Sequence, residues 1–270
     1  MSNHYCLGRI DFGVGSCACW CVDPPRNLVV FLHGFTGAAV ATWHDISANI
    51  RREGLFGDAD IVFLGYDSLS SRAGPMSGLI YQFLEEFLAD PASFSNRYLY
   101  YARAKRAPFA YERVLVVAHS LGGALIRQAA ARLAADNNPY TDRLQLLLFA
   151  PAHKGSNTLS NVNAAIASGS IMAALKVGLF RRVPILEDLP VDCRFITDIE
   201  IETLNQLSLR RRQCLVATKV HFGQYENTVE TRNFAQDPHY RTVPHRNHTD
   251  ICKTAAGNRL VISEIEECLR

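Results

Sequence analysis

The residue with the strongest signature of chemistry in this sequence is a serine, Ser120. It lies in the run AHSLGG, which follows the aliphatic stretch Val114–Val117 without a polar linker. The residues after it, Ala124–Ala134, include many strong helix formers and contain neither Pro nor Gly. A buried strand, a tight turn and a helix in this order place a serine at the apex of a nucleophile elbow. We therefore predict that Ser120 is a nucleophile at the carboxyl edge of a sheet.

The neighbours of this serine are as small as such a turn requires. A sharp turn leaves no room for side chains two residues before and after its apex, where the sequence has Ala118 and Gly122. The usual pattern is G-x-S-x-G, and alanine is the smallest replacement for its first glycine.

A serine hydroxyl needs a histidine base, which a carboxylate orients. Where the nucleophile is on an elbow, the chain order is serine, acid, histidine. This order excludes the histidines that precede or adjoin the turn: His4, His33, His44 and His119. His153 directly follows an expected strand and His221 ends another. The base should lie beyond the last strand, which favours His248 over His239 and His245; His245 stays open as an alternative.

The acid is expected in the loop beyond Val220, which offers Glu226, Glu230 and Asp237. The run GQYENTV puts Glu226 where G-x-x-D-x-x-V often supplies the acid. We favour Glu226, and Glu230 is the main alternative.

Two backbone N–H groups are needed to stabilise the oxyanion of an acyl-transfer reaction. Leu121, directly after the nucleophile and at a helix N-terminus, is predicted to supply one. Phe35, in the glycine-flanked run HGFTG, is predicted to supply the other. We expect His33 to bond nearby loop backbone and to have no catalytic role.

Apolar runs of strand length alternate with segments of helical periodicity along the chain. The expected strands are Tyr5–Phe12, Ala18–Val22, Leu28–Leu32, Ile61–Leu64, Val114–Val117, Leu144–Phe149, Gln213–Val220 and Tyr240–Val243. The expected helices are Ala38–Arg52, Pro75–Ala89, Ala124–Ala134, Phe195–Leu209 and Asn258–Leu269, with Ser93–Phe109 as an irregular surface excursion. This alternation predicts an α/β fold with a mainly parallel sheet covered on both faces and the chemistry at its carboxyl edge.

Length, composition and charge limit the number of domains and the classes of function. The chain has 270 residues with 48% apolar content and no repeat or linker, so residues 1–270 are expected to form one domain. A net charge of +2 with scattered basic residues does not favour nucleic-acid binding. No secretory signal is recognisable, so the eight cysteines are expected to be free thiols. Cys17, Cys19 and Cys21 alternate on one strand face, and their spacing favours buried apolar packing over a metal site.

Residues 156–190 interrupt the alternation with small and apolar residues mixed with Gly and Ser. We expect a small helical insertion above Ser120. An apolar underside and the cations Lys176, Arg181 and Arg182 would make it a lid over an acyl-chain pocket.

Several of these motifs occur together in a known family. They are FLHGFTG at 31–37 with Thr42-Trp43, GYDS at 65–68, HSLGG at 119–123, Pro151 with Lys154-Gly155-Ser156, and HTDICK at 248–253. In this order they resemble the lipase-like α/β-hydrolases that include the SERAC-type and PGAP-type serine esterases. The resemblance covers about Leu28 to Lys253. It implies an α/β-hydrolase fold with Ser120 and His248 as catalytic residues.

These observations together predict a serine esterase, of lipase or phospholipase type, that works through Ser120, His248 and Glu226 and needs no metal or organic cofactor. Thioesterase, amidase or acyltransferase activity would use the same groups, and a non-catalytic binding module of the same fold is a further alternative. The expected partner is an acyl ester or lipid, with peripheral membrane contact and a cytoplasmic location. No nucleic-acid partner is expected, and the oligomeric state is left open.

Overall fold

A mainly parallel sheet forms the centre of the molecule. The computed structural model describes residues 4–5, 7–99, 105–157, 183–209, 213–254 and 258–270. Its strands are β1 (Gly8–Arg9), β2 (Cys17–Cys19), β3 (Asn27–Leu32), β4 (Ala59–Leu64), β5 (Arg113–His119), β6 (Leu144–Phe149), β7 (Lys219–Tyr225) and β8 (Arg241–Asn247). Within the described residues they form one sheet in the order β1-β2-β4-β3-β5-β6-β7-β8. From β4 to β8 all neighbours are parallel, whereas β1 and β2 pair antiparallel at one edge.

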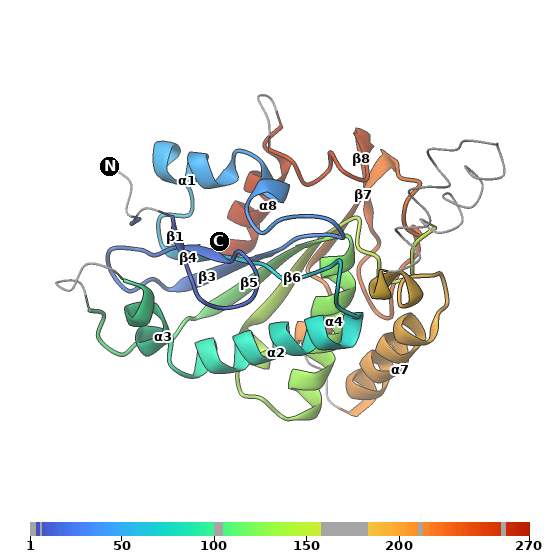
Figure 1. The fold of residues 1–270 in the computed structure, drawn as a ribbon, viewed down its shortest axis with the longest axis horizontal. Helices are drawn as coiled ribbons and strands as arrows, with labels where there is room; N and C mark the ends of the chain where they lie inside the picture. The colour runs from blue at the N-terminus through green and yellow to red at the C-terminus, as the bar shows by residue number, and fades with distance from the viewer. Residues whose placement is uncertain (1–3, 6, 100–104, 158–182, 210–212, 255–257) are drawn as a thin grey trace.

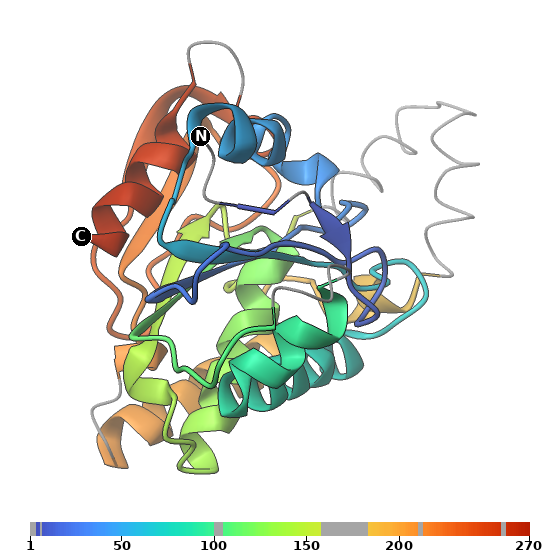
Figure 2. The same ribbon diagram turned by 90° about the vertical axis from the view of Figure 1, so that its left-hand side faces the viewer.

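Helices cover both faces of this sheet, as the alternation of the sequence predicts. The α-helices are α1 (Ile46–Glu53), α2 (Ala73–Ala89), α3 (Pro91–Tyr98), α4 (Leu121–Ala135), α7 (Arg194–Leu209) and α8 (Leu260–Leu269). Short 3-10 turns occur at η1 (Ala41–Trp43), η2 (Thr141–Arg143), η3 (Pro184–Glu187) and η4 (Gln213–Leu215). Helices α1 and α8 lie on one face and α2, α4 and α7 on the other (Figure 1). The side view in Figure 2 shows α1 above the sheet and α2 and α4 below it.

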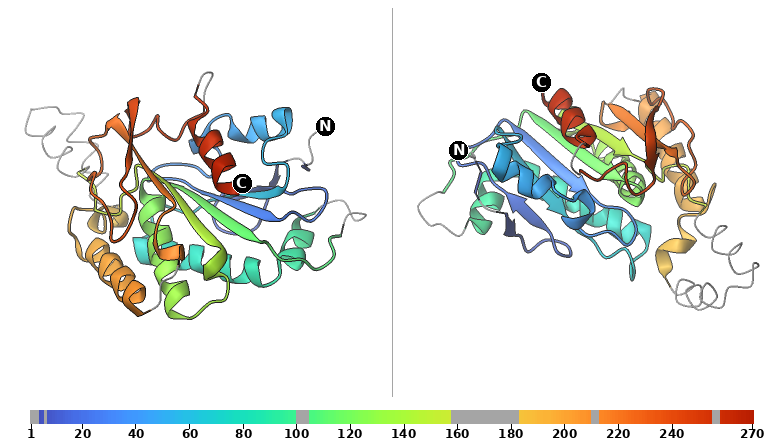
Figure 3. Two further views of the ribbon diagram at one scale, coloured as in Figure 1. Left: turned by 180° about the vertical axis from the view of Figure 1, so that it is seen from behind. Right: turned by 90° about the horizontal axis from the view of Figure 1, so that it is seen from above.

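The central strands are apolar on both sides because both sides are covered. Every residue of β3 and β4 is buried, as are six of the seven residues of β5. Seen from above, α1 and α8 lie over these strands (Figure 3, right). Strands buried on both faces lose the polar alternation of a half-exposed sheet, which is why their sequences read as continuous aliphatic runs.

Several expected elements have different boundaries in the structure. The expected strands Tyr5–Phe12 and Ala18–Val22 are shorter, at Gly8–Arg9 and Cys17–Cys19. The expected helix Ala38–Arg52 is split into η1 and α1, because His44 between them has a positive φ of 52°. The expected strand Gln213–Val220 begins only at Lys219 and continues to Tyr225. The last strand runs to Asn247 and passes through Pro244. Proline is tolerated there because β8 is an edge strand.

The first part of the segment expected to be irregular, Ser93–Phe109, is helical in the structure. Helix α3 begins at Pro91, and the side chain of Asp90 accepts a hydrogen bond from the amide of Ser93 at its N-terminus. Asp90 therefore caps the helix. Pro91 suits the first helical turn, where its missing N–H is not needed.

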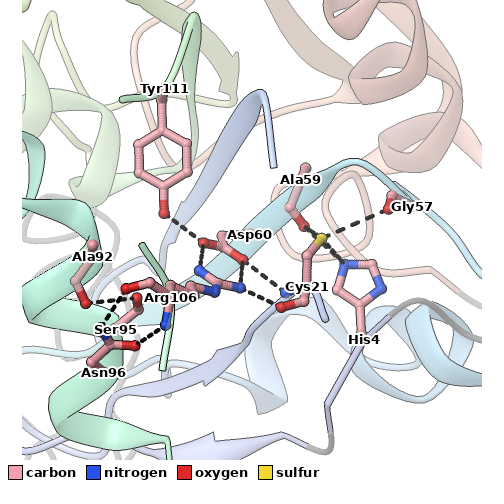
Figure 4. Close-up of polar contacts among 10 residues, drawn as sticks. All are labelled: His4, Cys21, Gly57, Ala59, Asp60, Ala92, Ser95, Asn96, Arg106 and Tyr111. Atoms are coloured by element: carbon pink, nitrogen blue, oxygen red, sulfur yellow. Dashed lines mark hydrogen bonds and ion pairs between the residues drawn. The ribbon is translucent and has the colours of Figure 1, made fainter. Parts of the chain in front are cut away.

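Arg106, in the same segment, enters a buried ion pair at the amino end of β4 (Figure 4). Its guanidinium donates to both carboxylate oxygens of Asp60, at 2.5 and 2.8 Å, and the two side chains are 1% and 0% exposed. Tyr111 donates its hydroxyl to the same carboxylate at 2.6 Å, and the amide of Cys21 donates at 2.8 Å. The carboxylate thus has four donors, as a buried charge requires. Because the backbone N–H and C=O of Arg106 also bond to the side-chain amide of Asn96, the cluster joins α3 to the sheet.

The cysteines in and next to β2 lie in or near the core, as the sequence predicts. Cys19 and Cys21 are buried and Cys17 is half-buried. Burial, with Asp60 nearby, raises the pKa of the Cys21 thiol far above its ordinary value. The seven cysteines in the described parts of the chain are free thiols, and no His, Cys, Asp or Glu cluster there could hold a metal ion.

The predicted insertion at 156–190 lies largely outside the described residues, which resume at Val183. Its two ends meet: the amide of Ser156 donates to the carbonyl of Leu189 at 2.7 Å, and Ser156 forms a bridge with Pro190. The insertion thus leaves and rejoins the fold at one point after β6, and its role as a lid stays a prediction. None of the helices described here is long and apolar enough to cross a membrane.

Candidate active site

Ser120 stands at a strained turn between β5 and α4. Its φ and ψ are 52° and −119°, a conformation that L-residues rarely adopt. Such strain costs about 1–3 kcal/mol and persists only where the surroundings enforce it. Here the amide of Ser120 donates to Phe149 at 3.1 Å, and its carbonyl accepts from Ala152 at 2.9 Å. The turn is therefore attached to the end of β6 by two hydrogen bonds.

The two glycines after this serine are required by close backbone and side-chain contacts. A Cβ on Gly122 would lie 2.7 Å from the carbonyl oxygens of Leu32 and His33. A Cβ on Gly123 would lie 2.5 Å from the Cβ of Pro151. The first of these contacts is the steric reason for the small residue that the elbow pattern demands.

Ser120, His248 and Glu226 form one hydrogen-bonded chain across the carboxyl edge of the sheet. The hydroxyl of Ser120 and Nε2 of His248 are 2.9 Å apart. Nδ1 of His248 lies 3.0 Å from each carboxylate oxygen of Glu226. With the proton on Nδ1, the imidazole donates to Glu226 and leaves Nε2 free to accept the serine proton. The structure thus assembles the three side chains that a serine nucleophile needs.

Glu226 is buried yet held ionised. Its side chain is 1% exposed. Burial raises its pKa, but hydrogen bonds from His248 and from the amides of Thr228 and Val229 outweigh burial, so the pKa lies below its ordinary value. The carboxylate is therefore available to orient the imidazole near neutral pH.

The alternatives for base and acid lie elsewhere. His245 is exposed, and its amide bonds to Gln224. Glu230 contacts Arg232 at 3.2 Å and Asn157 at 3.4 Å. Neither reaches the serine–histidine pair in the structure.

Asp237, the remaining acid candidate, is occupied by an ion pair with Arg127 of α4, in which both side chains are 1% exposed. Nε of Arg127 also donates to Nδ1 of His153 at 3.2 Å, and His153 donates from Nε2 to the carbonyl of Arg232. Burial, reinforced by the Arg127 cation, keeps the pKa of His153 well below its ordinary value. This cluster attaches the loop that carries Glu226 to the helix that follows Ser120.

His119 is a contributor to the site that sequence reasoning missed. Its Nε2 donates to the carbonyl of His248 at 2.8 Å, so the residue beside the serine holds the backbone of the histidine loop. Burial lowers the pKa of His119 to about 3, which keeps the ring neutral. Its place in chain order excludes it only as a base, and no sequence signal indicates this contact.

The loop after β3 carries Phe35, one of the two predicted oxyanion donors. His33 makes the structural contacts expected of it: Nδ1 donates to Gly34 at 2.8 Å, and Nε2 accepts from the amide of Tyr66. The ring also stacks on Tyr66 with centroids 4.1 Å apart. Leu121, the other predicted donor, is the first residue of α4, where the helix dipole favours negative charge.

Thr36, the next residue in this loop, is strained. Its φ is 58°, which is unusual for a β-branched side chain. The amide of Thr36 donates to the hydroxyl of Ser68 at 3.1 Å, and Ser68 is itself buried. Ser68, from the GYDS run, therefore holds the loop that presents the amide of Phe35.

We expect Ser68→Ala to lower kcat about tenfold with little change in KM, because the loop loses its support but substrate contacts remain. This is less than the roughly hundredfold or greater loss that follows removal of an oxyanion donor itself. Steady-state kinetics on a short-chain p-nitrophenyl ester would measure it. Ser68→Thr keeps the hydroxyl and should restore kcat; if it fails to, the hydrogen bond is not what matters.

Several solved structures have an architecture similar to that of this chain. The mouse α/β-hydrolase domain-containing protein 10 matches with a TM-score of 0.50 at 12% identity, covering 99% of this chain and 98% of that protein. Est1E from Butyrivibrio proteoclasticus matches at 0.48 and 14% identity, over 99% and 98% of the two chains. Phospholipase PlaB from Legionella pneumophila matches at 0.47 and 19% identity over 73% of this chain, which spans 38% of that protein.

Comparisons at the level of sequence found no match: no protein-family model and no curated protein aligns with this chain. At 12% identity, the similarity to the mouse structure concerns the fold alone. That architecture agrees with the strand order and with helices on both sides of the sheet. The chain therefore has the α/β-hydrolase fold.

Proposed function

We propose that this protein is a serine hydrolase that cleaves carboxylic esters through an acyl-enzyme. The observation that carries the proposal is the continuous hydrogen-bonded chain from Ser120 through His248 to Glu226, built on a strained elbow. A binding module would have no need to maintain the backbone strain at Ser120 or to bury the Glu226 carboxylate.

In the proposed mechanism, Ser120 attacks the ester carbonyl while Nε2 of His248 takes its proton. The oxyanion that forms would be stabilised by the amides of Phe35 and Leu121. His248 then gives the proton to the leaving alcohol, and water activated by the same histidine releases the acid. Glu226 holds the imidazole in the required tautomer and stabilises the imidazolium. These residues need no metal or organic cofactor for the reaction.

The lipase or phospholipase character is the finer part of the proposal. It is supported by the motif resemblance, including HTDICK around His248, and by the position of the 156–190 insertion after β6. The substrate would be an acyl ester or lipid, reached by peripheral contact with a membrane surface from the cytoplasm.

A fluorophosphonate probe tests the nucleophile directly. We expect the wild-type protein to be labelled and Ser120→Ala to remain unlabelled. Ser263→Ala, an exposed serine on α8, should label like the wild type. Labelling that persists in Ser120→Ala would remove this serine from the mechanism.

A substrate panel then defines the bond cleaved. Matched p-nitrophenyl esters, acyl thioesters and phospholipids should show the highest kcat/KM on oxygen esters. A strong preference for thioesters would replace the esterase proposal with a thioesterase of the same machinery.

A further inference from the structure

A pocket of about 150 Å³ lies beside the elbow, between the loop after β3 and the turn that follows His248. Its lining includes Phe35, Thr36, His119, Thr249 and Lys253. Its volume corresponds to that of about five waters in the liquid. It is therefore large enough for a small polar moiety and too small for a long acyl chain.

The pocket is lined by the predicted oxyanion donor and by chain neighbours of the proposed nucleophile and base. Phe35 is the predicted oxyanion donor, His119 precedes Ser120 in the chain, and Thr249 follows His248. The packing at this wall is close, since a Cβ on Gly34 would lie 2.9 Å from the Cβ of Ser120. A group bound in the pocket would thus lie against the loop and the turn that flank Ser120 and His248.

Lys253 supplies the one full positive charge among the lining residues. It is half-buried, and among the ion pairs of the described residues none involves it. The turn that carries it is fixed: the amide of Lys253 donates to the backbone carbonyl of Asp250 at 3.3 Å, and the next residue, Thr254, donates its hydroxyl to the carbonyl of Trp43 at 3.0 Å. The backbone that carries this cation is thus held at the pocket, and no carboxylate is among the residues that line the pocket.

Geometry distinguishes the alcohol side of the ester from the acyl side. Strand β3 lies on one side of β5 and β6 on the other, so the loop after β3 that lines the pocket and the described ends of the insertion, Ser156 and Pro190, flank Ser120 from opposite directions. The leaving alcohol must receive its proton from His248, and the pocket shares a wall with the His248 turn. The alcohol therefore belongs on the pocket side.

We propose that this pocket binds the alcohol part of the substrate and that this alcohol carries an anionic phosphate ester, which pairs with Lys253. The inference rests on the ester-hydrolase function proposed above. The bond that breaks is the acyl C–O bond, and the released product is an alcohol that bears the phosphate.

The test uses two substrates that differ only in the phosphate: octanoyl-glycerol and octanoyl-glycerol 3-phosphate, both below their micelle-forming concentrations. We expect the wild-type protein to have the higher kcat/KM on the phosphorylated ester. Lys253→Met should lower the ratio of the two values about tenfold, the effect of losing one charged hydrogen bond. Lys253→Arg keeps the charge and should retain most of the preference.

Lys105→Met removes the same charge from an exposed site at the other end of the sheet and should leave both rates unchanged. Circular dichroism checks that each variant folds. As a second measurement, glycerol 3-phosphate should inhibit p-nitrophenyl ester hydrolysis by the wild type more strongly than by Lys253→Met, and glycerol should not distinguish them.

The outcomes separate the two proposals. A wild type that prefers the neutral ester, or a Lys253→Met variant that loses both activities equally, overturns the pocket assignment. So does a protein that labels with fluorophosphonate but cleaves neither ester. If Ser120 is not labelled and no ester is cleaved, the hydrolase function itself fails.

Discussion

Glu226→Gln is expected to lower kcat on a short-chain p-nitrophenyl ester by about ten-thousandfold, as the equivalent change does in a serine protease. Glutamine keeps the size of the side chain and can still accept from Thr228 and Val229. Its amide nitrogen would face Nδ1 of His248, which favours the tautomer with the proton on Nε2. That tautomer cannot accept the proton of Ser120.

Glu230→Gln is the matched control for this substitution. Glu230 lies in the same loop, and its contacts are to Arg232 and Asn157. We expect kcat to stay within about twofold of the wild-type value, because no contact of a catalytic group changes. If Glu230→Gln causes the large loss and Glu226→Gln does not, the acid is Glu230 and the loop adopts another arrangement during turnover.

Asp60→Ala is expected to cause the largest loss of stability. It leaves the Arg106 guanidinium buried without its carboxylate, and breaking such a pair costs about 3–5 kcal/mol. Urea unfolding should show a much lower midpoint with a similar slope. Because Asp60 lies at the amino end of β4, away from Ser120, fluorophosphonate labelling per folded molecule should not change.

Two further variants test whether the loss of stability comes from the buried, unpaired charge. Glu112→Gln removes a carboxylate from the exposed ion pair with Arg26 and should leave the unfolding midpoint unchanged, because exposed pairs contribute little. The double variant Asp60→Leu/Arg106→Met removes both charges and should be more stable than Asp60→Ala. If the double variant is the less stable of the two, the loss arises from packing and not from the unpaired charge.

The elbow and the central strands can be predicted from the sequence, because interactions among neighbouring residues determine them. The elbow depends on a few consecutive residues, and the structure has the predicted strand, turn and helix around Ser120. The central strands were predictable because burial on both faces makes them uniformly apolar. Chain order alone reduced the choice of base and acid to a few candidates, and in the structure the preferred pair, His248 and Glu226, meets Ser120.

Other features depend on residues far apart in the chain. The end of β8 lies beyond Pro244 because the strand is at an edge, which no local pattern reveals. Arg106 belongs to a segment expected at the surface, whereas the structure pairs it in the interior with Asp60, 46 positions away.

The hydrogen bonds that hold the candidate site in place also join residues far apart in the chain. Ser68 reaches Thr36 across 32 positions, and His119 reaches the carbonyl of His248 across 129. These contacts are single hydrogen bonds between residues far apart in the chain, so they impose no periodicity and no composition on the sequence. The sequence by itself therefore determined which residues could react, whereas the tertiary structure decided which groups hold them in place, since that depends on how distant loops approach one another.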